Sequence, residues 1–185
     1  SAGLESAFPD VYEKLGSGDC NGRFKVLLSV LKIDRENQTP YKVTVNDVKQ
    51  LIEELLSKGG GEFSEEQKVA ICMIVAGETF AIRDERRRWR AEIPEAVPAI
   101  AGLLQDDSET VRVSALYAIS DVDAKDYMKD VTPKILPLLK DKSTDVRKRS
   151  LRTLGKHGDE DILPIIKELL GDDDPSIRQE AKQAV

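Results

Sequence analysis

The sequence has few of the residues that enzymes and metal sites most often use. It contains one histidine, His157, and two cysteines, Cys20 and Cys72, in 185 residues. Two cysteines are too few for a disulfide framework, so we expect a reducing compartment: the cytoplasm, with the nucleus as the second option. A single imidazole excludes most histidine-rich metal sites. We therefore expect no metal ion and no cofactor.

Long apolar runs and aromatic residues are also scarce. The longest apolar run, residues 69–77, has nine residues, whereas a membrane helix needs about 20, so we expect no membrane association. Aromatic residues make up 5% of the chain, which leaves few rings for stacking on nucleic-acid bases. The 28 Lys and Arg against 34 Asp and Glu give a formal net charge of −6. The resulting pI of about 5.0 is lower than is usual for a nucleic-acid-binding domain.

An internal repeat fills the C-terminal half of the chain. Segments 97–119, 132–154 and 163–185 align without gaps, at offsets of 35 and 31 residues. Each has a proline six residues before a leucine, an aspartate two residues after that leucine, and an arginine six residues after the aspartate. These columns are Pro98, Pro133 and Pro164; Leu104, Leu139 and Leu170; Asp106, Asp141 and Asp172; and Arg112, Arg147 and Arg178.

The repeat predicts two short amphipathic helices joined by a polar turn. Ile100, Leu103 and Leu104 recur at helical spacing in the first helix of the first copy. In the second helix Val111, Ala115, Leu116 and Ile119 do the same. N-cap residues precede the second helices at Ser108, Ser143 and Asp174. One such hairpin cannot bury its apolar face alone, so stacked hairpins are expected to form a solenoid.

This pattern resembles the HEAT repeat, particularly the short HEAT-like variety of phycobilisome lyase-type repeats. The resemblance implies an all-α fold, a right-handed α-α superhelix of about five helical hairpins whose second helices, the B helices, line the concave surface. Within a unit 93–185 it implies three repeats, 94–121, 130–157 and 160–185. It also implies an Asp–Arg ladder between neighbouring repeats, with the members Asp106, Arg112, Asp141, Arg147, Asp172 and Arg178.

Residues 1–92 fit the repeat less well. They predict either degenerate helical repeats, 4–33 and 44–92, or an unrelated N-terminal helical cap. A capping-box sequence at 64–67 opens a helix that the apolar pattern predicts over 69–82. At the other end Val185 falls on an apolar column with no polar capping helix behind it. We therefore expect a fragment of a longer polypeptide or, alternatively, a partner that covers this edge.

Two basic blocks interrupt the acidic chain. Residues 83–90 hold five arginines and the only tryptophan, and residues 147–156 hold five cationic residues. Both are predicted on, or at the end of, B helices, so they could share one groove that attracts anions. The candidate partner-binding residues are Arg86, Arg87, Trp89, Arg90, Lys148, Arg149 and Arg152. The competing interpretation is that these cations favour helix C-termini and solvation, and that Trp89 is buried.

No catalytic set is recognisable. His157 is expected to be an exposed capping side chain at the end of a B helix, Cys72 a core residue, and Cys20 a turn residue without a nearby base. The acidic clusters 106–107 and 172–174 are expected to cap helices in the turns. HEAT-like enzymes that bind iron use repeated His-Glu pairs, which this sequence lacks. We therefore predict that the protein is not an enzyme.

The sequence thus favours a non-enzymatic scaffold or adaptor that binds a partner protein, through an acidic segment of that partner, on the concave B-helix face. The alternative is a nucleic-acid-binding protein with a basic concave groove, similar to the HEAT-like alkylpurine DNA glycosylases. A third hypothesis, implied only by the likeness to phycobilisome repeats, is an accessory factor for a tetrapyrrole-bearing protein.

Overall fold

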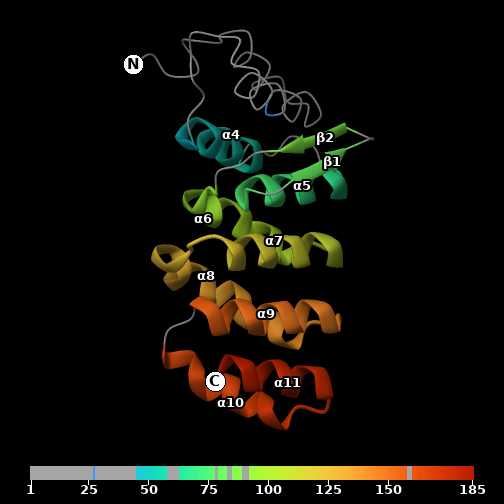
Figure 1. Ribbon diagram of the computed structural model, residues 1–185, viewed down its shortest axis with the longest axis vertical. Coiled ribbons are helices and arrows are strands. Elements are labelled where there is room, and N and C mark those ends of the chain that lie inside the picture. Colours follow the sequence, from blue (N-terminus) through green and yellow to red (C-terminus); the bar gives the residue numbers. More distant parts are fainter. Residues whose placement is uncertain are drawn as a thin grey trace.

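The computed structural model describes residue 27 and residues 45–57, 63–77, 79–82, 85–88, 92–157 and 160–185. The expected helical unit 4–33 lies outside the described residues except for Leu27, and Cys20 lies outside them too. Helices α5, α7, α9 and α11 are stacked one below the other along the long axis of the molecule (Figure 1). Each contacts the next, α5 with α7, α7 with α9 and α9 with α11. The expected all-α repeat architecture is therefore present.

Along the chain, the first and second helices of successive hairpins follow one another in turn, with short 3₁₀ segments between them. The N-terminal elements are α4 (Val45–Ser57), α5 (Glu65–Val75), β1 (Thr79–Ile82) and β2 (Glu85–Arg88). The next are η1 (Pro94–Ala96), α6 (Val97–Ile100), η2 (Ala101–Gln105), α7 (Glu109–Asp121), η3 (Lys125–Tyr127), α8 (Met128–Ile135) and η4 (Leu136–Lys140). The last are α9 (Thr144–His157), η5 (Glu160–Ile162), α10 (Leu163–Glu168), η6 (Leu169–Gly171) and α11 (Pro175–Ala184).

The B helices, α5, α7, α9 and α11, begin where the sequence predicts. The side chains of Ser108 and Ser143 accept hydrogen bonds from backbone N–H groups of the first helical turn, at 3.4 and 3.3 Å. Asp174 does the same for α11, with Pro175 in the first turn, where its missing N–H costs nothing. The predicted capping box at Ser64 and Gln67 opens α5. Each cap satisfies donors that a helix N-terminus leaves without partners.

The first member of each hairpin is a short α-helix that tightens into a 3₁₀ turn. Thus α6 continues into η2, α8 into η4 and α10 into η6. Prolines lie in these segments, at the start of α6 and α10, inside α8 and at the start of η4. A proline has no N–H to donate to the i−4 carbonyl, which shortens the regular α-helical stretch. The short first helices bring each acidic turn close to the following B helix.

The helix expected over 69–82 is shorter than predicted. It ends at Val75, and Gly77 follows with a positive φ of 71°. This left-handed conformation suits glycine and terminates α-helices. The chain then forms an antiparallel β-hairpin in which Thr79 pairs with Arg88 and Ile82 with Glu85. The prediction of a B helix reaching the first basic block was therefore wrong.

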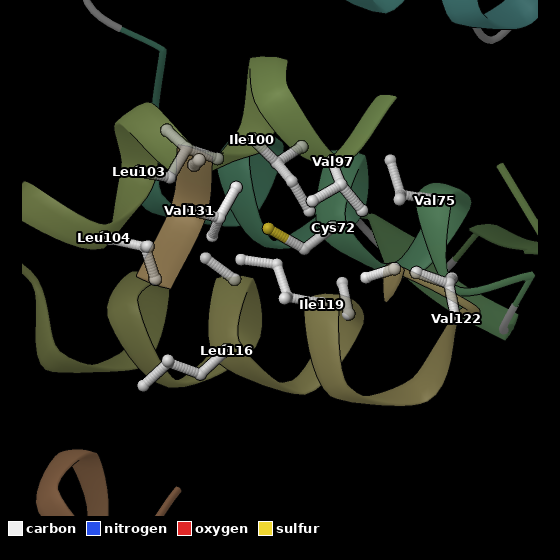
Figure 2. Close-up of a cluster of buried hydrophobic side chains, with 14 of the residues drawn as sticks. Cys72, Val75, Val97, Ile100, Leu103, Leu104, Leu116, Ile119, Val122 and Val131 are labelled. Atoms are coloured by element: carbon white, nitrogen blue, oxygen red, sulfur yellow. The ribbon is translucent and has the colours of Figure 1, made fainter. Parts of the chain in front are cut away.

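One continuous apolar core runs through the stack, from Val48 of α4 to Ala181 of α11. Figure 2 shows Cys72 of α5 among Val97 and Ile100 of α6 and Ile119 of α7. Cys72 is fully buried, as expected for a small core residue, and burial raises the pKa of its thiol to about 12. The apolar columns of the repeat are thus the contacts between successive hairpins, which leaves the outer face of the B helices free for other roles.

Candidate functional site

A ladder of ion pairs joins each B helix to the acidic turn of the next hairpin. Arg112 of α7 reaches Asp141, with Nη2 donating to Oδ1 at 3.0 Å and Nε 2.9 Å from Oδ2. One hairpin further on, Arg147 Nη2 of α9 lies 3.2 Å from Asp174 Oδ2. One hairpin earlier, Lys68 of α5 donates to Asp106. The cationic side chains of this row are therefore committed to contacts within the solenoid.

The ladder departs from the expected residues at two points. The acceptor for Arg147 is Asp174 and not Asp172, which instead accepts the backbone N–H of Asp174 at 2.8 Å. In α5 the ladder cation is a lysine, Lys68, and not an arginine. The ladder therefore begins one hairpin earlier than the three aligned arginines of the repeat indicated. Arg178 donates to the carbonyl oxygens of Asp172 and Asp173 in its own turn.

The ladder carboxylates are held in their charged form. Partial burial raises the pKa of Asp106, but hydrogen bonds from Lys68 and from the Ser108 N–H outweigh it, so the pKa lies below its ordinary value. The pKa of Asp141 is lowered in the same way, because the Ser143 N–H and Arg112 outweigh desolvation. Hydrogen bonds from Ser176 lower the pKa of Asp174. These charges stabilise the fold and are not available as proton donors near neutral pH.

Two further cationic side chains of α9 are bound by neighbouring helices. Arg152 makes a two-point contact with the buried carboxylate of Glu180, at 2.7 and 2.8 Å, and this hydrogen bonding raises the pKa of Arg152. Lys156 donates to the Ser120 carbonyl oxygen at the end of α7, and His157 Nε2 lies 3.0 Å from the same oxygen. His157 was expected to be exposed; it is half-buried and contacts a neighbouring helix.

An open hollow lies on the outer face of α7 and α9. Its volume is about 420 Å³, and it is lined by Glu109, Thr110 and Val113 of α7 and by Asp145, Lys148, Arg149 and Arg152 of α9. Within the described ranges, the Lys148 ammonium and the Arg149 guanidinium have no carboxylate partner. The Arg149 guanidinium carbon lies 5.2 Å from the centre of the Tyr117 ring, which is a cation–π contact.

The structure brings together only part of the predicted basic stripe. Lys148, Arg149 and Arg152 line the hollow, whereas Arg86 and Arg87 lie on strand β2 and not on a helix. Trp89 and Arg90 lie outside the described residues. Sequence reasoning missed Glu180, which pairs with Arg152, and Tyr117, whose ring contacts Arg149. Tyr117 of α7 faces the next hairpin and Glu180 of α11 faces the preceding one, relations that only the alignment of neighbouring repeats could have indicated.

The described residues contain no group of three or more His, Cys, Asp or Glu side chains arranged to hold a metal ion. No helix within the described ranges is long and apolar enough to cross a membrane. In the hollow, the cations of Lys148 and Arg149 lie beside one apolar side chain, that of Val113, and two carboxylates, those of Glu109 and Asp145.

Comparison with known proteins agrees with this architecture. Residues 132–185 match the family model for HEAT repeats. A solved structure of an engineered protein matches 95% of this chain and 76% of its own, at 16% identity and a TM-score of 0.54. The fold is an α-solenoid, and its C-terminal part matches HEAT repeats. A designed armadillo repeat protein in complex with the peptide (KR)4 is similar over 97% of this chain and 98% of its own, at 15% identity and a TM-score of 0.49. No curated protein matches the sequence.

Proposed function

We propose that this HEAT-like solenoid is a non-enzymatic scaffold that binds an acidic polypeptide segment of a partner protein in the hollow between α7 and α9. HEAT-like and armadillo-like repeats suggest a protein-interaction scaffold in general, but the fold alone does not indicate which partner is bound. We infer the chemistry of the partner from the side chains that line the hollow.

The observation that carries the proposal is the contrast between paired and unpaired cations. Arg112, Arg147 and Arg152 each contact a carboxylate of the following hairpin. Lys148 and Arg149 lie among them, yet no described carboxylate neutralises either one. Internal pairing accounts for the first three, so the charges of the other two are available for the carboxylates of a second molecule.

The surroundings of these cations favour a polypeptide over a nucleic acid. Glu109 and Asp145 line the same hollow, and the chain carries a net charge of −6. A continuous phosphate backbone would meet both carboxylates, whereas a polypeptide can place an acidic side chain on Lys148 and Arg149 and a neutral one elsewhere. Nucleic-acid affinity also grows with the number of phosphates neutralised, and two cations neutralise few.

The test is selection from a library of displayed unstructured peptides. Wild-type protein is compared with the double variant Lys148→Glu/Arg149→Glu. The control, Lys129→Glu/Lys134→Glu, makes the same charge change at two exposed positions of α8, on the other helix layer. We expect acidic peptides to be enriched by wild-type protein and by the control, and lost with the hollow variant.

Two results would contradict the proposal. One is an absence of enriched peptides, or enrichment that both variants retain. The other is a mixed-sequence DNA or RNA that binds at about 50 mM salt, with log affinity falling linearly in log salt, and that loses affinity in the hollow variant. That outcome would support the nucleic-acid hypothesis instead.

A further inference from the structure

The outer face of the B-helix layer changes its chemistry from one helix to the next. The positions one and five residues after Lys68, Arg112, Arg147 and Arg178 are four residues apart and therefore share one helix face. These positions hold Val69 and Met73 on α5, Val113 and Tyr117 on α7, Lys148 and Arg152 on α9, and Gln179 and Gln183 on α11. Along the stack the face is thus apolar, apolar with an aromatic ring, cationic, and finally neutral and polar.

The apolar half of this face retains accessible surface. Val69, Met73, Val113 and Tyr117 are all half-buried, and they pack against the core from outside. The contact between Tyr117 and Arg149 joins the apolar half to the cationic half at the hollow. A ligand carboxylate on Arg149 therefore lies next to the Tyr117 ring, where an apolar side chain of the same ligand can also pack.

We infer that the hollow recognises a two-part motif, in which an extended segment places an apolar side chain on Val113 and Tyr117 and acidic side chains on Lys148 and Arg149. This inference rests on the proposed function and makes it specific. It adds a required apolar residue, and it fixes the order of the two parts relative to the helices: the apolar part lies over α7 and the acidic part over α9.

The spacing of the motif follows from the stacking of the helices. Packed helices lie about 8–10 Å apart, and an extended chain advances about 3.3 Å per residue. In a segment that crosses from α7 to α9, the first acidic residue therefore lies about three residues after the apolar one. A helical ligand rises only about 1.5 Å per residue and would need about six.

The carboxylates in the hollow restrict where the carboxylates of a ligand can bind. Glu109 and Asp145 are at the N-terminal ends of α7 and α9, whereas Lys148 and Arg149 follow one turn later on α9. A ligand carboxylate placed at the N-terminal ends would meet like charge. The segment is therefore held one turn into the helices, at the level of Val113.

The test uses three capped 14-residue Gly-Ser peptides whose affinities are measured by NMR titration, which reaches millimolar Kd values. The first carries one Trp and, three residues later, two adjacent Glu. The second has the same composition with Trp and the Glu pair eight residues apart, and the third replaces Trp by Ser. We expect the first to bind at least five-fold more tightly than either of the others.

Protein variants assign the two parts of the motif. In Tyr117→Ala the advantage of the Trp peptide over the Ser peptide should fall to less than two-fold. In Arg149→Gln that advantage should persist while both peptides weaken. Thermal denaturation checks that each variant folds, and the comparison between peptides on wild-type protein does not depend on any variant.

The outcomes separate this inference from the proposed function. If all three peptides bind equally and Lys148→Glu/Arg149→Glu abolishes their binding, the two-part motif is overturned and acidic recognition remains. If no peptide binds, or the double variant changes nothing, both are overturned. A Ser peptide that binds as tightly as the Trp peptide is sufficient to reject the apolar part.

Discussion

Replacing Arg112 by Met tests the energetics of the ladder. The methionine retains most of the apolar stem and removes every donor. The Arg112 and Asp141 side chains are only 6% and 10% exposed, so the variant leaves a largely buried carboxylate without its cation. The carbonyl oxygens of Asp106 and Asp107 also lose the Nη1 donor, at 2.8 and 2.9 Å. Removing one partner of a buried pair costs about 3–5 kcal/mol.

The matched control is Arg147→Met on the next rung. Arg147 makes the same kind of contacts, but its side chain and that of Asp174 are 21% and 26% exposed. Solvent screens such a pair, so this variant should lose less stability than Arg112→Met. Urea denaturation followed by circular dichroism measures both free energies of unfolding.

A third variant separates the buried charge from the lost contacts. Asp141→Asn in the Arg112→Met background removes the uncompensated charge, so the double variant should recover part of the loss. The reasoning is refuted if Arg112→Met costs less than about 1 kcal/mol, the value of an exposed pair, or if it costs no more than Arg147→Met.

Three other predictions follow from the packing and the pKa shifts. Because the folded pKa of Asp141 is lowered, its contribution to stability is complete above the unfolded pKa of about 3.9 and is lost as the pH falls through the folded value. The urea concentration at which half of the wild-type protein is unfolded should therefore decrease when the pH is lowered below about 4. An equal decrease in the Asp141→Asn variant would contradict this. Cys72 should resist iodoacetamide at pH 8 until the protein is unfolded, since burial raises its thiol pKa to about 12; alkylation of Cys72 in the native protein, assigned to that residue by peptide mass spectrometry, would refute its burial. A Cβ at Gly155 would lie 2.6 Å from Ala184 Cβ, so Gly155→Ala should speed amide exchange in α11 and leave α7 unchanged, whereas slower exchange in α11 would show that helix propensity dominates.

The sequence was sufficient to predict the features that depend on local pattern. Helical periodicity and N-cap residues gave the B helices, including the caps at Ser108, Ser143 and Asp174. The same local rules could have ended α5 correctly, because Gly77 stands where a helix C-terminus often requires a positive φ. Gly77 is the last residue of the nine-residue apolar run 69–77, and this run hid the signal.

The features that sequence reasoning missed depend on the register between hairpins. Equal positions in the repeat do not always meet equal neighbours. Arg112 pairs with Asp141, whereas Arg147 pairs with Asp174 and not with Asp172, and Arg152 pairs with Glu180. A list of cations from the sequence cannot distinguish those that are neutralised within the fold from those that are free for a partner.

The central claim is that a partner polypeptide lies across α7 and α9. A crystal structure of the chain bound to its tightest selected peptide tests this most directly. We expect a ligand carboxylate within ion-pair distance of Arg149 and a ligand apolar side chain against Tyr117. A peptide bound to the α8 and α10 layer, or at the acidic turns, would contradict the account.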